Sequence, residues 1–226
     1  MNIRQIMKID LDRVMEKDPA ATSRYLVKRT YSGYRALCAY RRAHRLYEKG
    51  HKTLAFLISA KAKRQTGAEI HPGAKIGVGI FIDHGTGLVI GETAIVGDNC
   101  VLYQGVTLGG TGKDTGQRHP ILENGVMVSS GAKILGPVTI GENSKIGAGS
   151  VVLKNIPKNS TVVGVPGRVV KQEGKRIEMD QSVPDPILEC FERINERLEI
   201  IEKKLNIVHE DDTFLCANKS QKNENI

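Results

Sequence analysis

An aliphatic residue recurs at every sixth position through the middle of this 226-residue chain, and two breaks divide the pattern into three runs. The positions are Ile70, Ile76, Ile82 and Leu88, then Ile90, Val96, Leu102 and Leu108, then Leu122, Val128, Ile134, Ile140, Ile146 and Val152. A strand of a flat antiparallel sheet would instead alternate with a period of two. A period of six predicts a stacked solenoid, in which three hexads form one triangular coil and the repeated aliphatic residue points inward.

The longer break separates Leu108 from Leu122 by 14 residues. It contains four glycines and an Arg-His pair at positions 118 and 119. A stacked coil does not need these residues, so we expect a loop to protrude here and to carry part of a functional site. The shorter break is a slip of two residues between Leu88 and Ile90.

The segments on either side of the repeat have helical patterns. Asp18-Pro19 fits an N-cap followed by proline at the first helical position, and Lys49-Gly50 fits a helix end. Apolar residues between 187 and 208 recur at alternating spacings of four and three, which is a heptad pattern. Such a helix either joins three or more copies of the chain or packs on its own solenoid. We therefore expect an α+β fold with a helical domain at 1–66, a β-helix domain at 67–173, a C-terminal heptad helix at 174–208 and a flexible tail at 209–226.

Charge is distributed unevenly along the chain, whose 33 Lys and Arg exceed its 25 Asp and Glu by eight. Residues 1–64 hold 16 basic and 5 acidic residues, whereas residues 171–226 hold 9 and 13. A basic block can bind nucleic acid, but no recognition motif accompanies it, so we interpret these residues as solvated faces of amphipathic helices. We expect no membrane partner either, because no run approaches the roughly 18 apolar residues of a membrane span.

Four cysteines, Cys38, Cys100, Cys190 and Cys216, show no C-x-x-C spacing. Nothing at the N-terminus resembles a signal peptide, so we expect a reduced, cytoplasmic protein. Cys100 falls at a hexad position that small residues otherwise occupy, and we expect it to pack inward rather than to act as a nucleophile.

Several motifs follow the helical segment in a fixed order. They are Glu-Ile-His-Pro-Gly-Ala-Lys-Ile-Gly (69–77), Asp-His-Gly-Thr-Gly (83–87), Val-Ile-Gly-Glu-Thr-Ala (89–94), Gln-Gly-Val-Thr-Leu-Gly-Gly-Thr-Gly-Lys (104–113), Arg-His-Pro (118–120), Gly-Ala-Lys-Ile-Leu-Gly (131–136) and Lys-Ile-Gly-Ala-Gly-Ser-Val-Val (145–152). Together they resemble serine O-acetyltransferase, a left-handed parallel β-helix enzyme of cysteine biosynthesis. The resemblance covers about residues 15–170. It implies transfer of acetyl from acetyl-CoA to the hydroxyl of L-serine, giving O-acetyl-L-serine and CoA.

Two departures from the family's pattern affect what the resemblance implies. The better-known enteric-type enzymes have a longer N-terminal helical region that joins two trimers, so a homotrimer is at least as well supported here as a dimer of trimers. The carboxylate before Ile-His-Pro is often Asp in the family and is Glu69 here. Its acidic function is kept, but with a longer side chain.

Acetylation of serine requires a base that takes a proton from the hydroxyl while it attacks a thioester. An imidazole suits this task because its unperturbed pKa lies near neutrality. Of the six histidines, His84 and His119 lie outside the helices, the tail and the His71-Pro72 turn. The resemblance implies that His84 is the general base and that Glu69 orients its ring.

The substrates need further groups, which the resemblance also supplies. Serine carries a carboxylate that Arg118 could bind in a bidentate manner, and an ammonium for which Asp18 and Asp83 are candidates; His119 is expected to contact serine or the developing oxyanion. Acetyl-CoA, the only cofactor we expect, lies along the coil in such enzymes. Its candidate contacts are Gly110, Thr111, Ser130, Lys145 and Ala148, and less strongly Lys133 and Arg168.

The resemblance also implies partners. L-cysteine is expected to inhibit, since it has the ammonium and carboxylate of serine. Ile226 ends the chain, and family members end in Ile whose free carboxylate docks in O-acetylserine sulfhydrylase, a recognised mode of peptide capture.

Three other functions share parts of this pattern. A γ-type carbonic anhydrase would bind zinc through His84 and His119, but it needs a third histidine that residues 120–130 lack, so we expect no metal. A hexapeptide-repeat acetyltransferase acting on a sugar or antibiotic hydroxyl would use the same base without needing Arg118 or Asp18. A non-enzymatic scaffold would leave the Arg118-His119 loop without a role.

Overall fold

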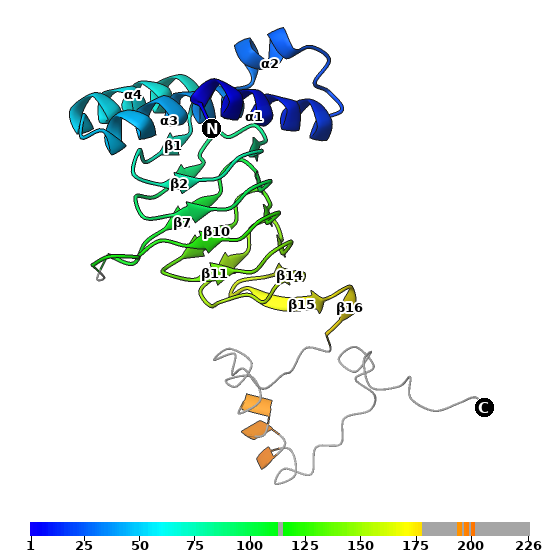
Figure 1. Cartoon of the computed structure of the whole chain (residues 1–226). Coiled ribbons are helices and arrows are strands. Elements are labelled where there is room, and N and C mark those ends of the chain that lie inside the picture. Colours follow the sequence, from blue (N-terminus) through cyan, green and yellow to red (C-terminus); the bar gives the residue numbers. More distant parts are fainter. Residues whose placement is uncertain (113–114, 178–193, 196, 199, 202–226) are drawn as a thin grey trace. The chain divides into compact units, whose positions relative to one another are not determined.

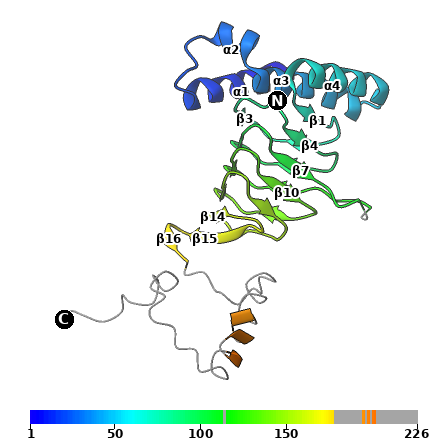
Figure 2. The same ribbon diagram turned by 180° about the vertical axis from the view of Figure 1, so that it is seen from behind.

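A computed structural model describes residues 1–112, 115–177, 194–195, 197–198 and 200–201 (Figures 1 and 2). The chain divides into two compact units, Met1–Met179 and Asp180–Ile226. In the second unit the described residues are helical, and the predicted seam residues among them, Ile194, Leu198 and Ile201, are about half exposed. The rest of the predicted C-terminal helix from residue 178 on, and the tail with Ile226, lie outside the described residues. The predicted domain boundaries stay a prediction.

Four helices open the first unit: α1 (Ile3–Lys17), α2 (Arg24–Thr30), α3 (Ser32–Glu48) and α4 (Lys52–Thr66). Helix α1 begins with a reciprocal capping box between Asn2 and Gln5. The prediction that Asp18 caps the start of a helix is wrong. Asp18 ends α1 and its Oδ1 accepts a hydrogen bond from the backbone N–H of Ala20 at 2.8 Å, because an Asp before Pro can also close a turn. Ser23 caps α2 instead.

Sixteen strands follow in the described part of the chain and form three sheets. Sheet A holds β1 (Glu69–Ile70), β4 (Val89–Ile90), β7 (Thr107–Gly109), β10 (Lys133–Leu135) and β13 (Val151–Val152). Sheet B holds β2 (Lys75–Ile76), β5 (Ile95–Val96), β8 (Ile121–Leu122) and β11 (Thr139–Ile140). Sheet C holds β3 (Phe81–Ile82), β6 (Val101–Leu102), β9 (Met127–Val128), β12 (Lys145–Ile146), β14 (Ser160–Val163), β15 (Arg168–Gln172) and β16 (Lys175–Arg176).

Parallel pairing stacks these short strands into a three-sided β-helix (Figure 1). Val89 pairs with Thr107, and Lys133 pairs with Val151, in each case the residue eighteen positions later. Thr107 pairs with Lys133, and the eight additional residues between them form the protruding loop. The predicted inward positions are buried, except that Ile76, on the edge strand of sheet B, is partly buried. The period-six prediction is therefore confirmed.

The helices close the first coil, whose strands would otherwise present unpaired backbone groups. Ala36, Leu37 and Tyr40 of α3 pack into the same core as the coil's aliphatic residues. Tyr40 donates its hydroxyl to the Ala74 carbonyl at 2.6 Å, and buried Arg41 donates to the carbonyls of Ile76 and Gly77. The helical layer thereby covers the exposed edge that such a solenoid must protect. No described helix is long and apolar enough to cross a membrane.

Candidate active site

The turn that carries His84 joins β3 to β4 and lies directly under the start of α3. His84 has a left-handed backbone, with φ of 59°. The Ser32 hydroxyl donates to the His84 carbonyl oxygen. Gly33 permits this approach, because a Cβ there would lie 2.1 Å from the carbonyl oxygen of Ile82. The helix start and the turn are thus held in contact, and the His84 side chain stays 74% exposed.

A hollow of about 460 Å³ opens at this contact. Both predicted serine-binding carboxylates, Asp18 and Asp83, line it together with His84. Asp83 Oδ1 lies 3.7 Å from His84 Nε2. The structure therefore brings the predicted base and both predicted ammonium ligands to one cavity, with an acidic wall suited to a cation.

Sequence reasoning missed Tyr31 and Ser32, which also line this hollow. Burial raises the pKa of the Tyr31 phenol, and its hydrogen bond with Asp18 and the charge of Asp83 act in the same direction. Tyr31 is thus a neutral hydrogen-bonding group between two carboxylates. The available signal was Gly33 inside a helical pattern, since an isolated glycine often marks a close approach of another backbone.

Glu69 lies on β1, and the structure shows it with a different partner from the predicted one. Its Oε2 lies 2.5 Å from Lys63 Nζ of α4. Among the described residues, no hydrogen bond joins Glu69 to His84. The predicted orienting contact stays a prediction, and in this single chain Asp83 is the carboxylate beside His84.

Arg118 and His119 lie at another corner of the coil, where the protruding loop returns to β8. Arg118 Nη2 donates to Glu92 Oε2 at 2.9 Å, and this hydrogen bond holds the pKa of Glu92 below its usual value. His119 is only 6% exposed, and burial lowers the pKa of its imidazole, with the Arg118 charge adding to the effect. A Cβ on Gly110 would lie 3.0 Å from His119 Nε2, so the predicted residue Gly110 lies beside this ring.

Ser130 and Ala148, two of the predicted acetyl-CoA contacts, lie at the corner of the coil that carries His84. Five left-handed glycines stack there, one per coil, with φ between 67° and 73°: Gly67, Gly87, Gly105, Gly131 and Gly149. Ser130 and Ala148 directly precede the last two of them. Lys133 of sheet A and Lys145 of sheet C flank this glycine column, and Lys133 Nζ donates to the Gly105 carbonyl. Arg168 lies on β15 of sheet C, and Thr111 lies in the loop at the other corner.

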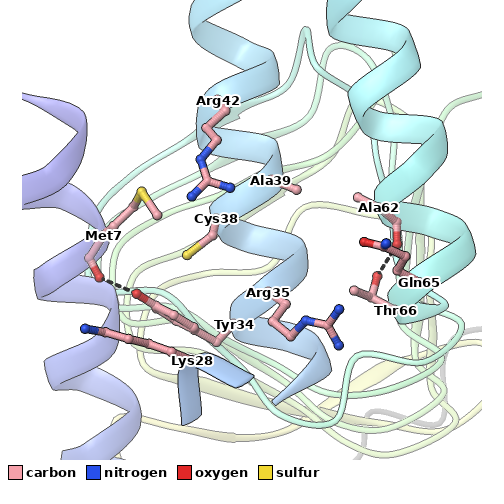
Figure 3. A pocket seen from close by; sticks show the side chains of 10 residues that line it. All are labelled: Met7, Lys28, Tyr34, Arg35, Cys38, Ala39, Arg42, Ala62, Gln65 and Thr66. Atoms are coloured by element: carbon pink, nitrogen blue, oxygen red, sulfur yellow. Dashed lines mark hydrogen bonds between the residues drawn. The ribbon is translucent and has the colours of Figure 1, made fainter. Parts of the chain in front are cut away.

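A second hollow, of about 360 Å³, lies among α1, α2, α3 and α4 and is separate from these predicted residues (Figure 3). Lys28, Arg35 and Arg42 line it, and no described carboxylate does. The Tyr34 hydroxyl at its edge donates to the Met7 carbonyl at 3.1 Å. Three of the basic N-terminal residues therefore line a hollow, and the expectation of solvated helical faces is incomplete for them.

Cys100 is fully buried, which confirms the inward packing expected for it, and this burial raises the pKa of its thiol to about 11. His84 and His119 occupy different corners, and no group of three potential metal ligands lies in the described part of the chain.

Comparison with known proteins places this geometry in context. The family model for bacterial transferase hexapeptide (six repeats) matches residues 119–154. The serine acetyltransferase of Bacillus subtilis (strain 168) is 51% identical over 197 residues, which cover 86% of this chain and 91% of that relative.

Solved structures are similar as well. The serine acetyltransferase of Neisseria gonorrhoeae in complex with serine matches at a TM-score of 0.72 and 44% identity, covering 75% of this chain and 69% of that one. The enzyme of Brucella abortus in complex with coenzyme A gives 0.72 and 44%, with coverage of 75% and 68%. A serine acetyltransferase in complex with cysteine gives 0.73 and 42%, with coverage of 75% and 70%. The expected fold, helices followed by a left-handed parallel β-helix, is confirmed.

Proposed function

Because this chain belongs to the serine acetyltransferase family, we propose that it moves the acetyl group of acetyl-CoA to the hydroxyl of L-serine by direct attack, with His84 as the general base. The observation that carries the mechanism is the hollow that holds His84, Asp18 and Asp83 together. The serine oxygen forms a bond to the thioester carbon as His84 takes the hydroxyl proton. The carbon–sulfur bond then breaks, and protonated His84 gives the proton to the CoA thiolate, which leaves as the free thiol.

Each charged end of serine needs a partner, and the proposed partners lie at different corners of the coil. Asp18 and Asp83 suit the ammonium, whereas Arg118 suits the carboxylate. In one chain Arg118 lies at the corner between β7 and β8, and His84 at the corner between β3 and β4. We therefore place Arg118 and His119 of one subunit opposite His84 of a neighbour in a homotrimer, with a dimer of trimers as the larger alternative.

The glycine column supports a route for acetyl-CoA. A Cβ on Gly149 would meet nothing within 4 Å, and those on Gly87, Gly105 and Gly131 would meet only the next glycine of the column. The column is therefore a smooth strip that leads from the His84 turn along the coil. Ser130 and Ala148 border the strip, and Lys133 and Lys145 add positive charge for phosphate. Gly110 and Thr111 would approach the thioester from the neighbouring subunit.

The remaining partners follow from the same site. L-cysteine would occupy the serine position because it presents the same two charges, and a related enzyme binds cysteine. O-acetylserine sulfhydrylase is the proposed partner for Ile226, and the cytoplasm is the proposed compartment. The helical, β-helix, heptad and tail segments keep their proposed boundaries at residues 66, 173 and 208.

Thiol release from acetyl-CoA tests the activity, with L-serine as acceptor against a sugar acceptor and a blank without acceptor.

Subunit complementation tests the shared site. Alone, His84→Ala should lower turnover by about 10²–10⁴-fold. Arg118→Ala should mainly weaken serine binding, so both variants should have little activity at a serine concentration near the native KM. Trimers reassembled from an equal mixture should regain about one quarter of native activity, because half of the subunits supply His84 and half of their neighbours supply Arg118. A mixture no more active than its parents would contradict the shared site, and native turnover in His84→Ala would contradict the base.

A further inference from the structure

One oxygen atom of Thr93 contacts the Arg118–His119 segment three times. Thr93 follows β4, at the corner where the protruding loop returns. Its Oγ1 lies 3.1 Å from the backbone nitrogen of Arg118 and 3.1 Å from that of His119. The same oxygen lies 2.9 Å from Nδ1 of the His119 ring.

Counting protons assigns a direction to each of these contacts. A hydroxyl has one proton and two lone pairs, and a backbone N–H can only donate. The two N–H groups therefore occupy both lone pairs of Thr93 Oγ1, and the hydroxyl proton is directed to His119 Nδ1. The backbone N–H of Thr93 also points at this Nδ1, at 3.2 Å. Nδ1 is thus an acceptor, and the proton of the neutral ring is on Nε2.

The printed hydrogen bonds of the His119 ring all involve Nδ1, and Nε2 packs against glycines. A Cβ on Gly91 would lie 2.0 Å from Nε2, so only glycine leaves room for the ring at this position. His119 is 6% exposed, and within the part of the chain that the structure describes no group accepts a hydrogen bond from Nε2. The charged and titratable groups that act on the ring are Arg118, Glu92 and His71. Burial and the Arg118 charge lower the pKa of His119 and favour the neutral ring, and Glu92 opposes them.

We propose that Thr93 is a positioning residue of the acetyl transfer, which holds His119 as a neutral imidazole with its proton on Nε2. His119 then serves as a fixed hydrogen-bond donor to the negative charge of the substrate or of the tetrahedral intermediate, and not as a second base. A donor oriented before the reaction stabilises developing charge without reorganisation. The inference rests on the proposed function, because it requires His119 to face the substrate.

Nitrogen NMR of the full chain labelled with ¹⁵N-histidine tests the tautomer directly, with His119→Gln assigning the signals. At pH 7.5 we expect an unprotonated Nδ1 and a protonated Nε2 for His119. Thr93→Ser keeps the hydroxyl and should keep this pattern. Thr93→Val has nearly the same shape without the hydroxyl. It should raise the share of the tautomer protonated on Nδ1, although the backbone N–H of residue 93 still donates to Nδ1. A native His119 protonated on Nδ1, or an unchanged pattern in Thr93→Val, would overturn the proposal.

Steady-state kinetics separates a positioning role from a purely structural one. Thr93→Val should lower kcat/KM for serine by about 10- to 100-fold, the range that small misplacements in a site produce. Thr93→Ser should recover most of this loss, and Thr139→Val, a matched change on sheet B, should have no effect. Equal kinetics for Thr93→Val and the native chain would overturn the positioning role. Absence of serine acetylation in the native chain would overturn the proposed function instead, while the NMR pattern would still decide whether Thr93 sets the tautomer.

Discussion

Glu92 and Arg118 form an ion pair beside the loop that interrupts the hexads, with 2.9 Å between Glu92 Oε2 and Arg118 Nη2. Glu92 precedes Thr93, so two consecutive residues after β4 hold two consecutive residues of the loop. Only one nitrogen of the guanidinium is used in this pair. Nη2 has a second N–H, which can form a fork for a carboxylate together with a neighbouring nitrogen of the guanidinium.

Glu92→Gln should therefore weaken serine binding more than turnover. The neutral amide holds Arg118 less firmly, and a partly exposed pair contributes up to about 1 kcal/mol, which corresponds to a rise of about fivefold in the KM for serine. The kcat should change by less than twofold. Glu142→Gln, an exposed change elsewhere on the coil, is the matched control. An unchanged KM in Glu92→Gln would show that Glu92 does not orient Arg118.

Gly33→Ala should damage both the fold and the active site. The new Cβ would lie 2.1 Å from the Ile82 carbonyl oxygen, so α3 must move away from the turn that carries His84. Overpacking of this kind costs about 1–3 kcal/mol. We expect a lower denaturation midpoint at fixed protein concentration and a lower kcat.

Gly112→Ala is the matched control for stability, because a Cβ there meets nothing within 4 Å. Its denaturation midpoint should equal that of the native chain. If Gly33→Ala unfolded at the native midpoint and acetylated serine at the native rate, the close contact between α3 and the turn would be disproved.

Periodicity made the coil predictable, because each inward aliphatic residue repeats the same local environment. Leu102 and Leu108 could be placed in the core without knowledge of any other chain segment, and both are fully buried. The loop at 110–119 was predictable for the complementary reason, as the place where the repeat stops. The left-handed turn of the coil came from the family resemblance, since the spacing alone carries no handedness.

Contacts between distant segments were not predictable in this way. The approach of Gly33 to Ile82 decides which residues join His84 in the hollow, and no repeat relates these two positions. Asp18 shows the same limit at short range. Asp-Pro fits both a helix start and a turn, and the hydrogen bond from the backbone N–H of Ala20 to Asp18 shows that a turn forms here. The partner of Glu69 in the structure is Lys63 of α4. The spacing of apolar residues does not predict where this helix packs against the coil, so the contact was not predictable.

Arg41→Ala should strongly destabilise the joint between the helices and the coil. Arg41 donates to both carboxylate oxygens of Asp10, at 3.1 and 3.2 Å, and to two carbonyls of the first coil. Both side chains are almost fully buried, and burial raises the pKa of Asp10 despite the neighbouring charge. Removal of one partner of a buried pair costs about 3–5 kcal/mol. The measurement is the thermal midpoint, with exposed Arg42→Ala as control.

The double variant Asp10→Ala/Arg41→Ala distinguishes the reasons for this loss. It should be more stable than Arg41→Ala alone, because it leaves no buried charge without a partner. If the double variant were less stable by the sum of the two single effects, the ion pair would contribute nothing beyond packing.

Stability should fall as the pH is lowered from about 7, because burial lowers the pKa values of His71 and His119. In the unfolded chain each imidazole binds a proton near its ordinary pKa of about 6.5, whereas in the folded chain it binds one only at lower pH. The unfolded state therefore binds more protons below about pH 6.5, and linkage requires that the free energy of unfolding decrease there. Above that pH this contribution is fully present.

Thermal midpoints measured from pH 7.5 to 5.0 should show a smaller decrease for His119→Gln than for the native chain. His51→Gln removes an exposed imidazole and should keep the native pH dependence. An equal decrease in all three proteins would show that the buried state of His119 has no energetic consequence.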